Sequence, residues 1–188
     1  MSILTVLTYP DERLRVKAAP VMEVNAEVRR LMDEMVETMR AHIGIGLAAT
    51  QVGVDKRVIV MEIPENIDDE EDYEEGDGSE RHKDIKTIVY KFANPEIIAS
   101  SGEVTFEEGC LSVPGVRADV DRFAEVTVRA LDEMGKTVEI AAKGLMAIAF
   151  QHEIDHLDGV LFVDKLSRLK RSLILRKYKR LQEEDKED

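Results

Sequence analysis

Cysteine is nearly absent from this chain, and so are long apolar stretches. Cys110 is the only cysteine among 188 residues, so an intrachain disulfide is impossible, which is typical of a protein from a reducing compartment. No apolar run approaches the roughly 18 residues that a membrane-spanning helix needs. The N-terminus lacks the basic start, apolar stretch and cleavage site of a signal peptide. We therefore expect a cytoplasmic protein that does not enter a membrane.

Positive charge is also scarce. The chain has 26 Lys and Arg against 39 Asp and Glu, which gives a formal net charge of −13. This balance argues against a DNA-binding protein, because nucleic-acid backbones attract a basic face. Acidic residues gather at about 65 to 84, and we expect a flexible insertion there. Basic residues gather at about 164 to 181, where apolar periodicity predicts a C-terminal helix.

The rest of the chain contains both helical and strand patterns. Apolar residues at helical spacing predict one helix from the N-cap Asn25 to about residue 42, and another from Leu145 to Leu157. Strands are predicted at Arg57 to Ile63, Thr87 to Phe92, Glu103 to Phe106, Val126 to Leu131 and Thr137 to Ala142. The length suits a single domain over residues 1–188. We predict an α+β fold in which antiparallel β-sheets pack around the helix at 145–157.

Residues 152–156 read His-Glu-Ile-Asp-His, which is the strongest local signal in the sequence. On a helix, residues four apart lie on one face, so both imidazoles can bind one metal with Glu153 beside them. The alternative is a helix with two surface histidines. Leu145, Ile148 and Ala149 lie on the same face, however, and histidines in an apolar stripe need a polar partner. The pattern therefore favours one divalent metal ion.

A catalytic site built on His152 and His156 needs a third protein ligand and one open position. No histidine follows His156, and the glutamates of the polar C-terminal tail are poor candidates. Cys110 is the better candidate, because it follows a predicted strand and thiolate is a strong ligand for iron, zinc or cobalt. Gly109 would allow a close approach of the backbone. A buried structural thiol is the alternative for this cysteine.

Three segments together resemble the peptide deformylases, in the order found in that family. They read Gly-Ile-Gly-Leu-Ala-Ala-Thr-Gln at 44–51, Glu-Gly-Cys-Leu-Ser at 108–112 and Gln-His-Glu-Ile-Asp-His at 151–156. The resemblance covers nearly the whole chain except the acidic segment. It implies a hydrolase that removes the formyl group of N-formylmethionyl peptides and releases formate. It also implies one divalent metal, typically Fe²⁺, which Ni²⁺, Co²⁺ or Zn²⁺ can replace.

Roles for individual residues follow from this chemistry. Glu153 would take a proton from the attacking water and return it to the leaving nitrogen. By resemblance, the oxyanion would receive hydrogen bonds from the Gln51 side chain and the Leu111 backbone N–H. The resemblance also places Gly46 in the substrate-binding wall and Arg117 near the substrate backbone. A pocket for the methionine side chain would consist of Ile45, Leu145, Ile148 and Ala149, although ordinary core packing also explains these residues.

Partners and rival functions complete the expectations. In the resembled family, a basic C-terminal helix can dock on the ribosome, whereas a solvated helix face is the plainer interpretation of such a charge run. We expect a monomer. One rival function is a metallopeptidase that cleaves internal peptide bonds, which the segments around Cys110 and Gln51 disfavour. The other is an inactive relative that only binds ribosomes or formylated peptides, which the presence of Glu153 disfavours.

Overall fold

The structure is a computed structural model that describes residues 2–65 and 86–184. Apart from Glu65, the acidic segment predicted at about 65 to 84 lies outside the described residues. The larger sheet is antiparallel with strand order β1-β2-β3-β6-β7, and a second sheet pairs β4 with β5. The larger sheet contains β1 Gly46–Ala48, β2 Val58–Pro64, β3 Thr87–Ser101, β6 Glu125–Leu131 and β7 Thr137–Lys143. The smaller sheet contains β4 Val104–Cys110 and β5 Val113–Arg122.

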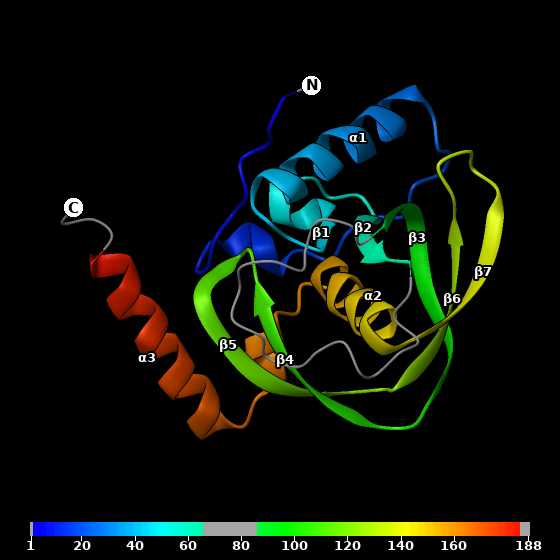
Figure 1. Cartoon of the computed structure of the whole chain (residues 1–188). Helices are drawn as coiled ribbons and strands as arrows, with labels where there is room; N and C mark the ends of the chain where they lie inside the picture. The colour runs from blue at the N-terminus through cyan, green and yellow to red at the C-terminus, as the bar shows by residue number, and fades with distance from the viewer. Residues whose placement is uncertain (1, 66–85, 185–188) are drawn as a thin grey trace.

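The helices are α1 Ala26–Ala41, α2 Gly144–Leu157 and α3 Arg168–Glu184, with 3₁₀ turns at Glu12–Arg15, Ala49–Val52 and Phe162–Lys165. The predicted α+β fold with antiparallel sheets is confirmed. Figure 1 shows α2 near the middle of the molecule, with the strands of the larger sheet on one side and β4 and β5 on another. None of the described helices has both the length and the apolar composition that crossing a membrane requires.

Strand β2 shows how the core positions α2. Its side chains alternate between the two faces of the sheet, as the pleat requires. Val58 and Val60 pack in one cluster with the apolar face of α1, and Ile59 and Met61 pack in another with α2. Complete burial of such side chains contributes about 1.5 to 3 kcal/mol each. The two helices thus cover opposite faces of the larger sheet, and α2 is held along its length.

Strand β1 was not predicted, and the strands predicted to end at Phe92 and Phe106 continue to Ser101 and Cys110. Strand β5 and the start of the C-terminal helix also differ from the sequence predictions. Strand β5 was not predicted, because Pro114 and Gly115 near its start are typical of a turn, and Gly115 does have a φ of +77°. The C-terminal helix begins at Arg168 rather than near residue 164. Asp164 accepts a hydrogen bond from the Leu161 N–H at 2.9 Å within a 3₁₀ turn, and Leu166 is extended. Local capping in this segment therefore delays the start of the helix.

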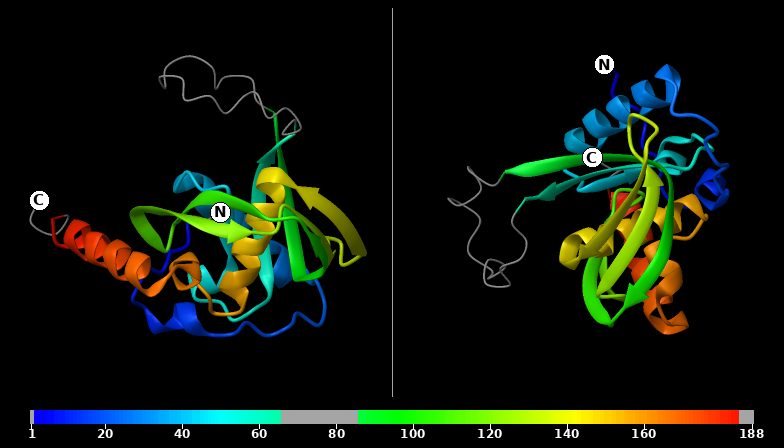
Figure 2. Two further views of the ribbon diagram at one scale, coloured as in Figure 1. Left: turned by 90° about the horizontal axis from the view of Figure 1, so that it is seen from below. Right: turned by 90° about the vertical axis from the view of Figure 1, so that its right-hand side faces the viewer.

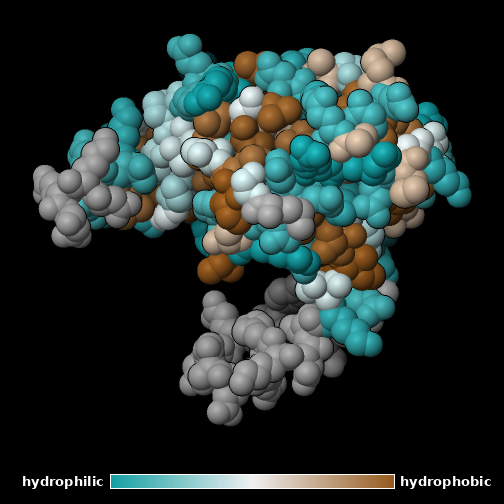
Figure 3. All heavy atoms as spheres, turned by 90° about the horizontal axis from the view of Figure 1, so that it is seen from above, coloured by the Kyte–Doolittle hydropathy of each residue, from teal (hydrophilic) through white to brown (hydrophobic). Residues whose placement is uncertain are grey.

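Helix α3 lies along the outside of the smaller sheet. Figure 2 shows it running beside β5, apart from α1 and the larger sheet. Its Tyr178 is buried and donates a hydrogen bond to the Tyr9 carbonyl at 2.8 Å. Leu169 and Leu173, part of its apolar periodicity, are 71% and 54% exposed. The surface viewed from the α1 side is mainly hydrophilic with separate apolar patches (Figure 3).

Candidate metal centre

The end of β4 and one face of α2 bring together a thiol and two imidazoles. The Sγ of Cys110 lies 3.2 Å from Nε2 of His156, which lies 3.2 Å from Nε2 of His152. All three candidate ligand atoms lie within 4.8 Å of one another. Ligands held about 2.0 to 2.3 Å from a tetrahedral metal are separated by about 3.3 to 3.6 Å. The three side chains predicted from the sequence as ligands therefore fit one divalent ion.

A buried ion-pair network orients this cluster. Nδ1 of His152 donates a hydrogen bond to Oε2 of Glu108 at 2.8 Å, which leaves Nε2 free to bind a metal. Glu108 accepts two hydrogen bonds from Arg122, at 2.6 and 2.9 Å, and Arg122 also binds Asp155 at 2.6 Å. Sequence reasoning assigned these three residues no role. Only the position of Glu108, directly before Gly109 and Cys110, could have pointed to it.

The charges around the cluster suit a cation. Burial would raise the pKa of Glu108, but hydrogen bonds from Arg122 and His152 lower it to about 2, so the carboxylate is ionised. Burial lowers the pKa of His152, yet Cys110 and Glu108 raise it well above its usual value. Groups that stabilise a positive imidazole stabilise a bound metal in the same way. Burial and the neighbouring His152 lower the pKa of His156, so this ring is neutral and could bind a metal.

Glu153 is a buried carboxyl group beside the three candidate ligands. Among the described residues, its Oε2 has no hydrogen-bond partner, although the residue is only 4% exposed. Burial raises its pKa to about 7, a value suited to accepting and returning a proton near neutral pH. A Cβ atom added to Gly46 would lie 2.4 Å from Oε1 of Glu153. The glycine of β1 therefore leaves the space that this carboxyl group occupies.

The two predicted oxyanion donors, Gln51 and Leu111, both lie close to Cys110. Gln51, in the 3₁₀ turn after β1, accepts a hydrogen bond from the Ala48 N–H at 2.8 Å through Oε1. This bond fixes which end of the amide carries the donor, and Nε2 then points toward Ser112 Oγ at 3.1 Å and Cys110 Sγ at 3.7 Å. Leu111 follows Cys110 in the turn between β4 and β5. Both residues line the groove described next.

A groove of about 1070 Å³ leads to this cluster. The predicted substrate-binding residues all line it, namely Ile45, Gly46, Arg117, Leu145, Ile148 and Ala149. Sequence reasoning missed further lining residues, among them Phe106 of β4, Ile43 after α1 and Lys177 of α3. Periodicity within each element could not show that these elements border the same groove. Arg117 is exposed and pairs with Glu107 at 3.8 Å.

Comparison with known proteins gives a consistent result. The family model of polypeptide deformylases matches residues 3–172. A peptide deformylase of Alkalilimnicola ehrlichii is 49% identical over 181 residues, which cover 96% of this chain and 92% of that protein. The crystal structure of peptide deformylase from Ehrlichia chaffeensis superposes with a TM-score of 0.84 at 40% identity, covering 98% of this chain and 99% of the other. A peptide deformylase structure from Legionella pneumophila gives 0.81 at 42% identity, covering 100% and 99%.

Proposed function

The chain belongs to the peptide deformylase family, whose activity is the removal of the N-formyl group from nascent peptides, and we propose that Glu153 is the general base of this hydrolysis. One observation carries the assignment: a buried carboxyl group without a hydrogen-bond partner among the described residues stands beside three converging ligand atoms. The family assignment supports neither the metallopeptidase nor the inactive relative.

The family is metal-dependent, and Cys110, His152 and His156 are the proposed ligands. A thiolate with two imidazoles favours Fe²⁺, Zn²⁺, Co²⁺ or Ni²⁺ over Mg²⁺ or Ca²⁺, which prefer oxygen ligands. Fe²⁺ is the proposed ion in the cell, and the other three are proposed substitutes. When bound, the metal polarises the formyl carbonyl and lowers the pKa of water.

Side-chain and backbone groups of the protein transfer the proton and stabilise the developing negative charge. Glu153 accepts a proton from the attacking water and delivers it to the amide nitrogen as formate leaves. Nε2 of Gln51 and the backbone N–H of Leu111 donate hydrogen bonds to the oxygen on which negative charge develops. The bond between Gln51 Oε1 and the Ala48 N–H supports this role, because it holds the amide with its donor end toward Cys110.

The groove is the proposed site for the formylmethionyl peptide. Its extended backbone would lie beside Gly46, where main-chain hydrogen bonds are accessible. Leu145, Ile148 and Ala149 of α2, together with Ile45, line the groove and offer an apolar surface to the methionine side chain. Arg117 would contact the peptide backbone. Ile45 remains 46% exposed, which supports contact with a ligand rather than core packing alone.

The ribosome is the proposed partner of α3, and the chain is proposed to act as a cytoplasmic monomer with one domain over residues 1–188. Support for the docking surface comes from Leu169 and Leu173, which stand exposed on a helix rich in Lys and Arg. Deleting the residues after Leu166 should abolish co-sedimentation with ribosomes. Unchanged co-sedimentation would rule out this role for α3.

Formate release from formyl-Met-Ala-Ser tests the catalytic proposal. Anaerobically purified protein loaded with Fe²⁺ or Ni²⁺ should release formate, and Glu153→Ala should lose at least about 10²-fold in kcat while retaining its metal. Metal content is measured on the same samples, so loss of the base is separated from loss of the ion. An active Glu153→Ala protein would overturn the assignment of the base. Cleavage of an unformylated peptide would favour the peptidase instead.

A further inference from the structure

Lys177 of α3 lines the groove that leads to Glu153, although α3 packs mainly on β5. The residue after it, Tyr178, is buried and bonded to the Tyr9 carbonyl. Leu181, one turn further along, approaches Gly115, where an added Cβ would lie 3.0 Å from Leu181 Cδ1. These two anchors set the rotation of α3 about its axis. The position of Lys177 beside the groove is therefore built into the fold.

The cationic side chains that line the groove differ in whether they have an acidic partner. Its lining cations include Arg117 and Lys177. Arg117 forms an ion pair with Glu107 at 3.8 Å, and both side chains are more than 60% exposed. Lys177 has no carboxylate within 4 Å in the described part of the chain. Deeper in the groove, Glu108 is neutralised by Arg122. In a chain with a net charge of −13, the Lys177 ammonium group thus borders the groove without a carboxylate partner among residues 2–65 and 86–184.

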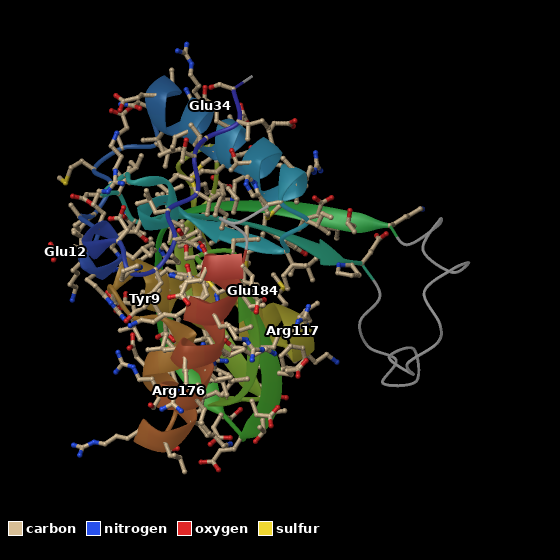
Figure 4. All side chains as sticks on the ribbon, turned by 90° about the vertical axis from the view of Figure 1, so that its left-hand side faces the viewer. Tyr9, Glu12, Glu34, Arg117, Arg176 and Glu184 are labelled. Atoms are coloured by element: carbon tan, nitrogen blue, oxygen red, sulfur yellow. The ribbon has the colours of Figure 1, made fainter. Side chains whose placement is uncertain are left out.

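The reacting end of the substrate is set by Glu153 and Cys110, and the pocket on α2 takes the first side chain. The remaining peptide must leave along the open part of the groove, past Arg117 and Lys177. Figure 4 shows Arg117 between α3 and α2, while Arg176 lies on the outer surface of α3. From this arrangement we infer that Lys177, with Arg117, selects formylmethionyl peptides that carry Asp or Glu downstream of the methionine. The inference rests on the proposed function of the groove.

The test compares peptides that differ in one side chain. A formyl-Met-Ala-Ser-Ala series would carry Asp, Asn or Lys at the second, third or fourth residue, and kcat/KM for formate release would be measured at low ionic strength. We expect Asp to exceed Asn by about two- to fivefold at one of these positions, which is the range for an exposed ion pair. The preference should disappear at about 1 M salt, where charges are screened within about 3 Å.

Two charge reversals on adjacent residues form a matched pair. In Lys177→Glu the ratio of kcat/KM for the Asp peptide to that for the Asn peptide should fall below one, and the Lys peptide should become the better substrate. Arg176→Glu makes the same change in the net charge of α3 on an exposed residue that does not line the groove, and it should retain the Asp preference. This control separates a local contact from the overall charge of the helix.

The outcomes distinguish the two proposals. If the wild type deformylates the neutral peptide but shows no Asp preference, Lys177 does not select substrates, and the proposed function stands. The same conclusion follows if both reversals change the preference equally. If no peptide releases formate, both the proposed function and this inference fail.

Discussion

Glu108 on β4 accepts a hydrogen bond from Nδ1 of His152 on α2 at 2.8 Å, and this contact joins the smaller sheet to the helix that carries two proposed ligands. Both side chains are mostly buried, so little water competes for the bond. The contact fixes the tautomer of His152 and the orientation of its ring. Metal affinity should therefore depend on a residue that does not bind the metal.

Replacing Glu108 by Gln should weaken metal binding by about 10- to 100-fold, the usual effect of losing the partner of a ligating histidine. The change removes the negative charge opposite Arg122 and retains the side-chain shape. The dissociation constant for Zn²⁺ or Co²⁺ would be measured by competition with a coloured chelator. Glu107→Gln removes the same charge from an exposed neighbour and should leave the affinity unchanged. Equal losses of metal affinity in the two variants would contradict the role of Glu108 in orienting His152.

A methyl group at residue 46 should disturb the proposed base. In Gly46→Ala the new Cβ would lie 2.4 Å from Oε1 of Glu153, so the carboxyl group must move. Because misplacement by about 1 Å can cost about 10²-fold, we expect kcat for formate release to fall by about that factor. Gly109→Ala is the comparison, since its Cβ would meet Arg117 Cγ at an ordinary 3.5 Å. If Gly109→Ala were the more damaging change, displacement of Glu153 would not be the cause.

Asp164 should contribute stability that acid removes. Burial disfavours its charge, but bonds from Arg15 and the Leu161 N–H, with Arg171 at 2.9 Å, hold its pKa below the usual 3.8. A carboxyl group with a lowered native pKa stabilises the fold above its unfolded pKa and loses that effect as the pH falls through the native value. Asp164→Asn should therefore be less stable at pH 7, and the difference should shrink below about pH 4. Urea unfolding between pH 2.5 and 7 measures this, and a constant difference would refute it.

Gly159, directly after the C-cap of α2, should resist substitution more than an ordinary turn glycine. Its φ is +74°, and an added Cβ would lie 2.4 Å from the Arg15 carbonyl oxygen. Gly135 has a φ of +78°, but its added Cβ would meet only Val24 at 3.7 Å. Gly135→Ala should cost about 1 kcal/mol for the backbone conformation, and Gly159→Ala should cost more because of the clash. Equal free energies of unfolding for the two variants would show that the Arg15 backbone moves away from the new Cβ at no cost in stability.

Local geometry explains how much of the site could be read from the sequence. His152 and His156 are four residues apart, so α2 places both on one face, with their Nε2 atoms 3.2 Å from each other. Helix α1 was predicted closely for the same reason, since Asn25 accepts a hydrogen bond from the Val28 N–H at 3.0 Å as an N-cap. Cys110 could be named as third ligand because the chain has no other cysteine.

The remaining features depend on long-range pairing that no local pattern encodes. Arg122 reaches Glu108 because β5 pairs with β4, and β5 itself was missed, since Pro114 and Gly115 are typical of a turn. Lys177 borders the groove because α3 is anchored on the smaller sheet and through Tyr178, which bonds to Tyr9, 169 residues away in sequence. The sequence by itself determined which residues are proposed as metal ligands and as general base, because these proposals follow from residue type and spacing. Tertiary structure decided which buried charges surround these side chains and which cation borders the groove, because both depend on how separate elements pack.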